Sequence, residues 1–138
     1  MGAWDIGALD NDDACDFIAD LMNTAGDRWN MIEMTLALVC GSAGDTAAED
    51  ECAALAAAEV VAAAACGSSV KELDRELAAW VMRSAPKHLH MLSRDAIQAV
   101  DKIAARSELH ELWREAGELE AWLDSLGDLK KRLTIMIH

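Results

Sequence analysis

The sequence predicts an all-α fold, a compact single-domain bundle of five to seven helices around a central alanine-rich helix. The composition is 53% hydrophobic, with one proline and no tyrosine, and alanine and leucine lose less entropy in helices than β-branched or aromatic residues. Apolar residues also recur at three- and four-residue steps, the period of a helix face. A length of 138 residues suits one hydrophobic core, so we expect residues 1–138 to form one domain.

The N-terminal part contains an expected lead segment and two helices. Residues 1–10 contain glycines and should lie extended across one end of the bundle. Asp10 or Asn11 can then cap the first helix. Gly26-Asp27 marks a break between the first and the second helix. The second helix, which stops at Gly41, is predicted by apolar residues at helical spacing: Trp29, Ile32, Leu36 and Val39.

The third predicted helix should be the central one. Thr46-Ala47-Ala48-Glu49 is a capping-box pattern, and the residues that follow to Cys66 are apolar on every side apart from Glu59. A helix that is apolar all round belongs in a core. A second capping box begins at Ser69 and opens a fourth helix, which Pro86 prevents from continuing.

Two helical regions complete the expected bundle. Ser93 should cap a fifth helix, whose inner face would carry Ala96, Val100 and Ile103. Between Ser107 and Leu133, leucines at alternating three- and four-residue steps resemble a heptad seam. Gly117 and Gly127 weaken this region, so it is either two shorter helices or one helix that bends.

The charge of the chain is acidic and uneven. The net charge is -13, and residues 1–69 hold 13 acids against one base, whereas residues 70–138 hold 12 acids against 11 bases. Such a field repels nucleic acids and acidic membranes and attracts cationic surfaces. No apolar run approaches the roughly 20 residues that span a bilayer, and the four cysteines lack Cys-x-x-Cys spacing. We therefore expect a cytoplasmic protein with reduced thiols.

Four carboxylates cluster at the expected start of the first helix: Asp10, Asp12, Asp13 and Asp16. Hard cations bind to several carboxylate oxygens at one point, but the cluster fails the calcium-loop template because Ala14 and Cys15 stand where a ligand and a glycine are required. Acids in the first turn instead stabilise the free amides and the helix dipole. The histidines have no zinc spacing and no phosphate-binding loop occurs, so we expect no metal and no cofactor.

Glu59 is the only polar side chain between Ala53 and Ala65. A buried carboxylate must be protonated or must accept hydrogen bonds, here from backbone amides, a tryptophan N–H or Arg28. We expect it to hold the lead segment or another helix end, so that the structural motif comprises Trp4, Asp10, Asp13 and Glu59. The alternative is a carboxylate-dependent enzyme, with or without the assistance of a metal, in which Glu59 acts with Asp12, Asp13 or Asp16.

The tryptophans and leucines mostly predict core packing. Trp122 lies beside the leucine seam and is the one tryptophan that we expect to help a partner dock. The seam itself should pack within the chain. A structural homodimer through Leu112, Leu119 and Leu126 is the alternative.

Three segments resemble the bacterial family known as domain of unknown function 4259. They are the opening Met1-Gly2-Ala3-Trp4 with the later Asp10-Asn11-Asp12, the run from Ala56 to Ala63, and the segment from Ser107 to Trp113. Asp5, the pair Ala8-Leu9 and Phe17 depart from the family pattern. The resemblance implies a shared fold and a bacterial source, and it implies no activity.

By elimination, the sequence favours a non-enzymatic interaction protein. Its acidic N-terminal half would bind a basic protein, as immunity or inhibitor proteins bind cationic toxins or nucleases. The expected binding surface comprises Asp45, Glu49, Asp50 and Glu51 near the start of the central helix, together with Asp12 and Asp16.

Overall fold

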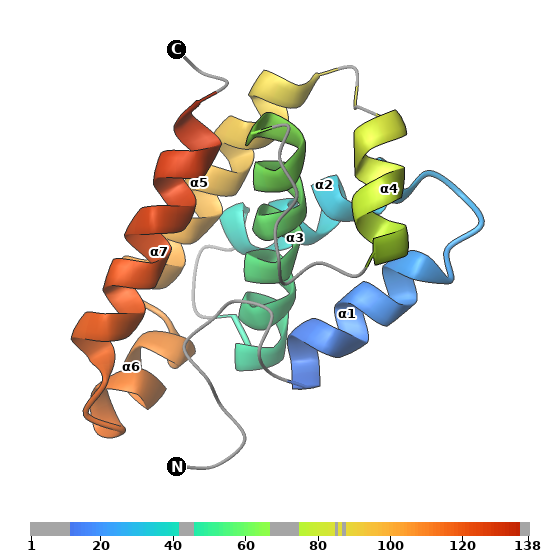
Figure 1. The fold of residues 1–138 in the computed structure, drawn as a ribbon. Helices are drawn as coiled ribbons and strands as arrows, with labels where there is room; N and C mark the ends of the chain where they lie inside the picture. The colour runs from blue at the N-terminus through green and yellow to red at the C-terminus, as the bar shows by residue number, and fades with distance from the viewer. Residues whose placement is uncertain (1–11, 42–45, 67–74, 85, 87, 136–138) are drawn as a thin grey trace.

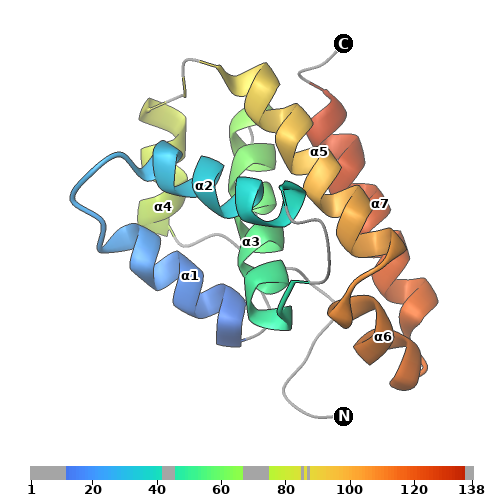
Figure 2. The ribbon, with the colours of Figure 1, turned by 180° about the vertical axis from the view of Figure 1, so that it is seen from behind.

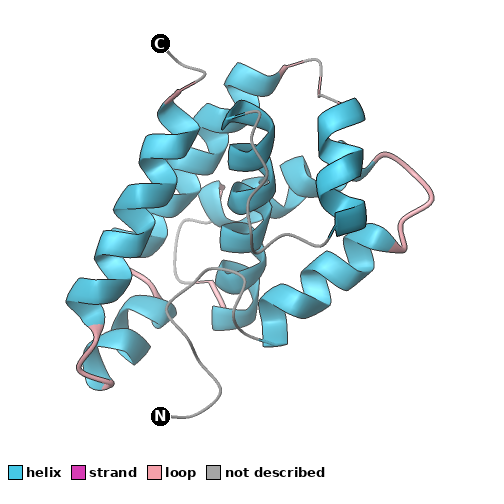
Figure 3. Cartoon of the chain, in the orientation of Figure 1, coloured by secondary structure: helices cyan, strands magenta, loops and turns pink. Residues whose placement is uncertain are grey.

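The computed structural model describes residues 12–41, 46–66, 75–84, 86 and 88–135, which form seven α-helices and no strand (Figures 1 and 3). The predicted all-α class is therefore confirmed. The helices are α1 (Asp12–Met22), α2 (Arg28–Cys40), α3 (Ala48–Cys66), α4 (Arg75–Arg83), α5 (Leu89–Ala105), α6 (Glu108–Glu115) and α7 (Leu119–Thr134).

The alanine-rich helix α3 is central, as predicted. It packs against each of the other six helices, with α5 and α7 on one side and α1 and α4 on the other (Figures 1 and 2). Its small side chains let these neighbours approach closely, because a core is packed at crystal-like density and alanine adds little volume. The fully buried positions of α3 are Ala54, Ala56, Ala57, Ala58, Val60, Val61 and Ala62.

Local signals fix two of the helix boundaries. Asp27 caps α2, since its side chain accepts a hydrogen bond of 3.2 Å from the backbone N–H of Asn30, and Gly41 follows the last residue of α2, as predicted. Gly117 has a φ of +77°, a conformation that favours glycine. The chain reverses there between α6 and α7, so the last helical region is two helices.

Two predicted caps are wrong. Ser93 does not cap α5 but is fully buried inside it. The helix begins earlier, at Leu89, because Leu92 extends its apolar face one turn towards the N-terminus. Thr46 is not the N-cap of α3, because the helix begins at Ala48 and the carbonyl of Ala47 accepts from the backbone N–H groups of Asp50 and Glu51. The Thr46 hydroxyl donates to Glu51 Oε2 at 2.7 Å.

Some expectations concern residues outside the described ranges. These are the extended lead of residues 1–10 with Trp4 and Asp10, the exposure of Asp45, and the cap at Ser69. The single-domain expectation for residues 1–138 stays a prediction. Among the described helices, none combines the length and the apolar character that crossing a membrane requires.

Candidate functional site

The structure brings most of the described acidic residues of the expected binding surface to one end of the bundle. Helices α1 and α3 begin side by side there (Figures 1 and 2). Asp12 and Asp16 are exposed one turn apart on α1, Glu49 is exposed and Asp50 is half-buried. Acids at these positions stabilise the positive end of the helix dipole, so part of the acidic excess has a structural explanation.

Glu51 does not belong to an exposed surface, and the expectation that it does is wrong. It is only 1% exposed, and its Oε1 accepts a hydrogen bond of 3.0 Å from the backbone N–H of Leu109, in the first turn of α6. In return, Glu108 Oε2 accepts a bond of 3.3 Å from the backbone N–H of Ala48, the first residue of α3. Each of the two helices thus caps the N-terminus of the other, an arrangement that we call the reciprocal cap.

The reciprocal cap also affects a neighbouring thiol. Cys52 follows Glu51 and is buried. Burial, and then the negative charges of Asp13 and Glu51, raise the pKa of this thiol to about 12. Cys52 is therefore a neutral, unreactive side chain of the core at physiological pH.

Glu59 pairs with a residue that the sequence did not suggest. It is 8% exposed, and its two oxygens accept hydrogen bonds of 2.7 and 3.1 Å from the guanidinium of Arg132, in the last turn of α7. Arg28, one of the expected partners, instead donates to the carbonyl of Met22 at 3.1 Å. Glu59 also lines neither of the two hollows described below. These contacts support a structural role in which α3 holds the end of α7.

Only part of the predicted leucine seam lies on the inner face of α6 and α7, where Leu109, Leu126 and Leu133 are buried. Trp122 is 2% exposed and lies against Trp113, with ring centroids 6.5 Å apart, so its expected docking role is wrong. Leu126 is also 2% exposed, whereas Leu112 is 44% exposed and Leu119 is half-buried. Leu112, Leu119 and Leu126 therefore do not present one shared surface to a second copy.

The described residues offer few groupings of metal-ligand side chains. No group of three or more His, Cys, Asp or Glu side chains among them could hold a metal ion. One of the two hollows lies at the turn between α5 and α6 and is lined by residues 105–108, His110 and Glu111. Its serine and histidine are already bonded, because Ser107 Oγ accepts from the backbone N–H of His110 and His110 Nδ1 lies 2.8 Å from the carbonyl oxygen of Ala104.

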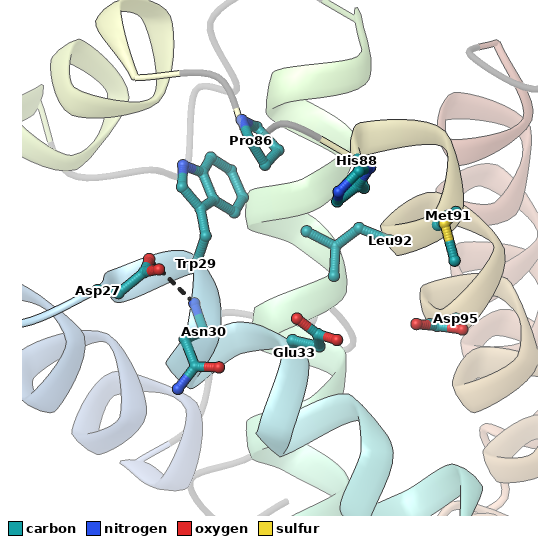
Figure 4. Close-up of a pocket in the computed structure, with 9 residues that line it drawn as sticks. All are labelled: Asp27, Trp29, Asn30, Glu33, Pro86, His88, Met91, Leu92 and Asp95. Carbon is teal, nitrogen blue, oxygen red and sulfur yellow. Dashed lines mark hydrogen bonds between the residues drawn. The ribbon is translucent and has the colours of Figure 1, made fainter.

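The other hollow lies between the start of α2 and the start of α5, and we call it the α2–α5 groove (Figure 4). Its volume is about 420 Å³, within the roughly 300–1,000 Å³ of pockets that hold small organic groups. Three of its lining residues, Met91, Leu92 and Asp95, belong to the first two turns of α5, and this helix begins at the opposite end of the bundle from the starts of α3 and α6 (Figure 1). The lining residues are Asp27, Trp29, Asn30, Glu33, Pro86, His88, Met91, Leu92 and Asp95.

The groove combines apolar side chains with carboxylates. Trp29, Leu92 and Met91 supply apolar surface, and three acids, Asp27, Glu33 and Asp95, supply negative charge. Within the described part of the chain, none of these three acids forms a salt bridge. Among the described residues, the groove thus presents three carboxylates without a salt-bridge partner beside an apolar surface.

Two contacts hold Trp29 in place, and a third binds its neighbour Arg28 to the same tryptophan, Trp80. The ring of Trp29 stacks on Trp80 with centroids 4.7 Å apart, and the Nε1 of Trp29 donates to the backbone carbonyl of Ser84. The guanidinium of Arg28 lies 5.3 Å from the centroid of the Trp80 ring. These contacts join α2, α4 and the segment after α4, so the indole is a fixed side of the groove.

The groove continues into an exposed apolar strip on α2. Asn30 lines the groove and donates to the sulfur of Met34 at 3.5 Å, and Met34 and Leu38 are both exposed. Helix α2 therefore carries two apolar faces, because its core face is a separate set of residues, Ile32, Leu36 and Val39. An exposed apolar strip beside a hollow is typical of an interaction surface.

The sequence did not single out the acids of this groove. Asp27 was identified only as part of the break between the first two helices, and Glu33 and Asp95 lie on α2 and α5, 62 positions apart along the chain. The available signal was the second apolar face of α2, formed by Met34 and Leu38. The acids that meet this face became evident only when α2 was seen packed against α5.

The comparisons with known proteins identify a family. A family model described as a domain of unknown function, DUF4259, matches residues 2–125 of the chain. No curated protein and no solved structure matches the chain.

Proposed function

The chain belongs to the DUF4259 family, a domain of unknown function, and we propose that its role is to bind a basic protein partner without catalysing a reaction. The observation that carries the proposal is the α2–α5 groove, where Glu33 and Asp95 lie beside the apolar surface of Trp29 and Leu92. A protein partner that binds such a surface pairs cationic groups with the carboxylates and packs apolar side chains against the apolar part of the groove.

The charge of the whole chain supports the same kind of partner. A net charge of -13 draws cationic proteins from a distance of about a Debye length, roughly 8 Å at physiological salt, and accelerates their association. Close contacts in the groove then determine which cationic protein stays bound. Salt should therefore slow association steeply.

The side chains around the groove suit binding of an irregular protein surface. Met34 and Met91 are exposed on α2 and α5, and methionine adapts its shape to its neighbours because it is unbranched and flexible. A bacterial cytoplasmic immunity or inhibitor protein, which covers a cationic toxin or nuclease, is the specific role that we propose within this class.

The test uses a defined probe, a short amphipathic helical peptide of leucine and lysine. Its counterpart, in which glutamate replaces lysine, is the charge control. We expect the protein to bind the lysine peptide and not the glutamate peptide, with affinity that falls as salt increases. Absence of binding to the lysine peptide, or affinity that does not depend on salt, would overturn the proposal.

Two variants with the same change in net charge locate the binding surface. Glu33→Gln with Asp95→Asn alters the groove, and Asp16→Asn with Glu49→Gln alters exposed acids elsewhere. We expect the groove variant to weaken binding about tenfold and the control variant to weaken it less than about threefold, because contact charges act more strongly than distant ones. Equal losses, or a larger loss in the control variant, would refute the groove as the binding site.

A further inference from the structure

We infer that the α2–α5 groove receives one arginine side chain of the partner, with its guanidinium between the indole of Trp29 and the carboxylate of Glu33. This inference rests on the proposed function and specifies the residue that the groove recognises. Three features of the groove support it: the aromatic side, the carboxylate and the apolar lining.

The aromatic side of the groove suits a planar cation. Trp29 is fixed by its stack on Trp80 and by its bond to Ser84, so it offers a flat surface that does not need to be ordered on binding. A guanidinium stacks on indole better than an ammonium does, because it is planar and weakly hydrated. The chain already uses this contact, since Arg28 lies over the ring of Trp80.

Glu33 is the acid best placed to pair with that cation. In Figure 4 its carboxylate lies below the hollow, between the Trp29 side and the α5 side, whereas Asp27 lies on the other side of Trp29 and accepts from Asn30. A carboxylate can accept two parallel hydrogen bonds from a guanidinium, as Glu59 does from Arg132 in this chain. An ammonium makes no such forked pair.

The apolar lining suits the aliphatic part of an arginine side chain. Leu92 and Pro86 line the same hollow as Trp29; Leu92 is buried and Pro86 is half-buried. Arginine packs its methylene groups on such surface while its charged group reaches polar partners. Asp95, on the α5 side of the groove, adds further negative potential for the same charge.

The experiment compares four versions of the leucine-lysine peptide that differ at one central position. This position carries lysine, arginine, norleucine or citrulline, the neutral analogue of arginine with nearly the same shape. Dissociation constants are measured by calorimetry against the wild-type protein and the variants Glu33→Gln and Glu49→Gln. Glu33 and Glu49 are both exposed, and these substitutions change the net charge equally.

We expect the arginine peptide to bind wild type about tenfold more tightly than the citrulline peptide and about threefold more tightly than the lysine peptide. The arginine-to-citrulline ratio should fall to about twofold in Glu33→Gln and stay unchanged in Glu49→Gln. In spectra of ¹⁵N-labelled protein, the indole N–H resonance of Trp29, assigned with Trp29→Phe, should shift more with arginine than with lysine.

The outcomes separate this inference from the function on which it rests. Binding of all four peptides with equal affinity, still weakened by the groove variant, would refute the arginine site and leave the basic partner intact. An arginine preference that persists in full in Glu33→Gln would also refute it. If no cationic peptide binds, both the inference and the proposed function fail.

Discussion

The pair between Glu59 and Arg132 allows a quantitative test of how α3 holds α7. Glu59→Gln keeps the size of the side chain and removes its charge, and Arg132→Met keeps much of the length and removes the guanidinium. We expect each single substitution to lower the free energy of unfolding and the double variant to lose less than the two single losses combined. The difference is the coupling energy of the pair.

The magnitude follows from burial and geometry. Removal of one member of a fully buried pair costs about 3–5 kcal/mol, and hydrogen bonds to charged groups contribute about 1.5–3 kcal/mol. Glu59 and Arg132 side chains are 11% and 26% exposed, and Arg132 also lies 3.3 Å from the exposed carboxylate of Asp128. Partial solvent screening places the expected coupling at about 1.5–2.5 kcal/mol.

The assay is urea denaturation with a matched pair on the same helix. Lys130 and Asp101 form a salt bridge between α7 and α5 whose side chains are 39% and 53% exposed. The variants Lys130→Met and Asp101→Asn, alone and together, should give a coupling below about 1 kcal/mol. If the two pairs couple equally, the argument from burial is refuted. If Glu59→Gln were to abolish a catalytic activity while stability stayed unchanged, the alternative of an enzyme centred on Glu59 would gain support.

Three further predictions concern single positions. Glu51→Ala should lower stability by about 2–4 kcal/mol because one buried and one part-buried hydrogen bond are lost, whereas Glu49→Ala should change it by less than about 0.5 kcal/mol. Chemical denaturation measures both, and equal effects would contradict the reciprocal cap. Burial raises the pKa of Cys52 from 9.0 to about 12, so above pH 9 the folded state keeps a proton that the unfolded state releases. Stability should therefore be intact below about pH 9 and fall above it by up to about 1.4 kcal/mol per pH unit. This fall should be smaller in Cys52→Ala, and an unchanged slope in that variant would contradict the prediction. Gly117→Ala should cost about 1–2 kcal/mol because of its positive φ, measured as a lower melting temperature, whereas a stability equal to wild type would show that the turn adjusts without strain.

Local signals were sufficient for much of the fold. Asp27 and Gly41 delimit α2 because a cap and a stop act on their own helix, and the apolar character of α3 places it in the core wherever its neighbours lie. Gly117 likewise predicted a weak point in the last region. Such features depend on a few consecutive residues, which the sequence displays directly.

Contacts between distant residues were not predictable in the same way. Glu59 and Arg132 are 73 positions apart, and nothing in either segment indicates the other. The leucine seam was predicted correctly only in part: Leu109, Leu126 and Leu133 are buried, whereas Leu112 is exposed. Trp113 and Trp122 occupy other inner positions of the two helices. The α2–α5 groove depends on how two helices rotate against each other, which the pattern of one helix does not determine.

The reciprocal cap has a consequence for how the molecule opens. The backbone N–H of Ala48 and that of Leu109 are bonded to side chains of the opposite helix, so separation of α6 from α3 removes a cap from both at once. A fluctuation that frays one helix start therefore also frays the other, although 60 positions separate Ala48 from Glu108. The two starts form one cooperative opening unit, in which the amide hydrogens of both helices exchange with solvent together.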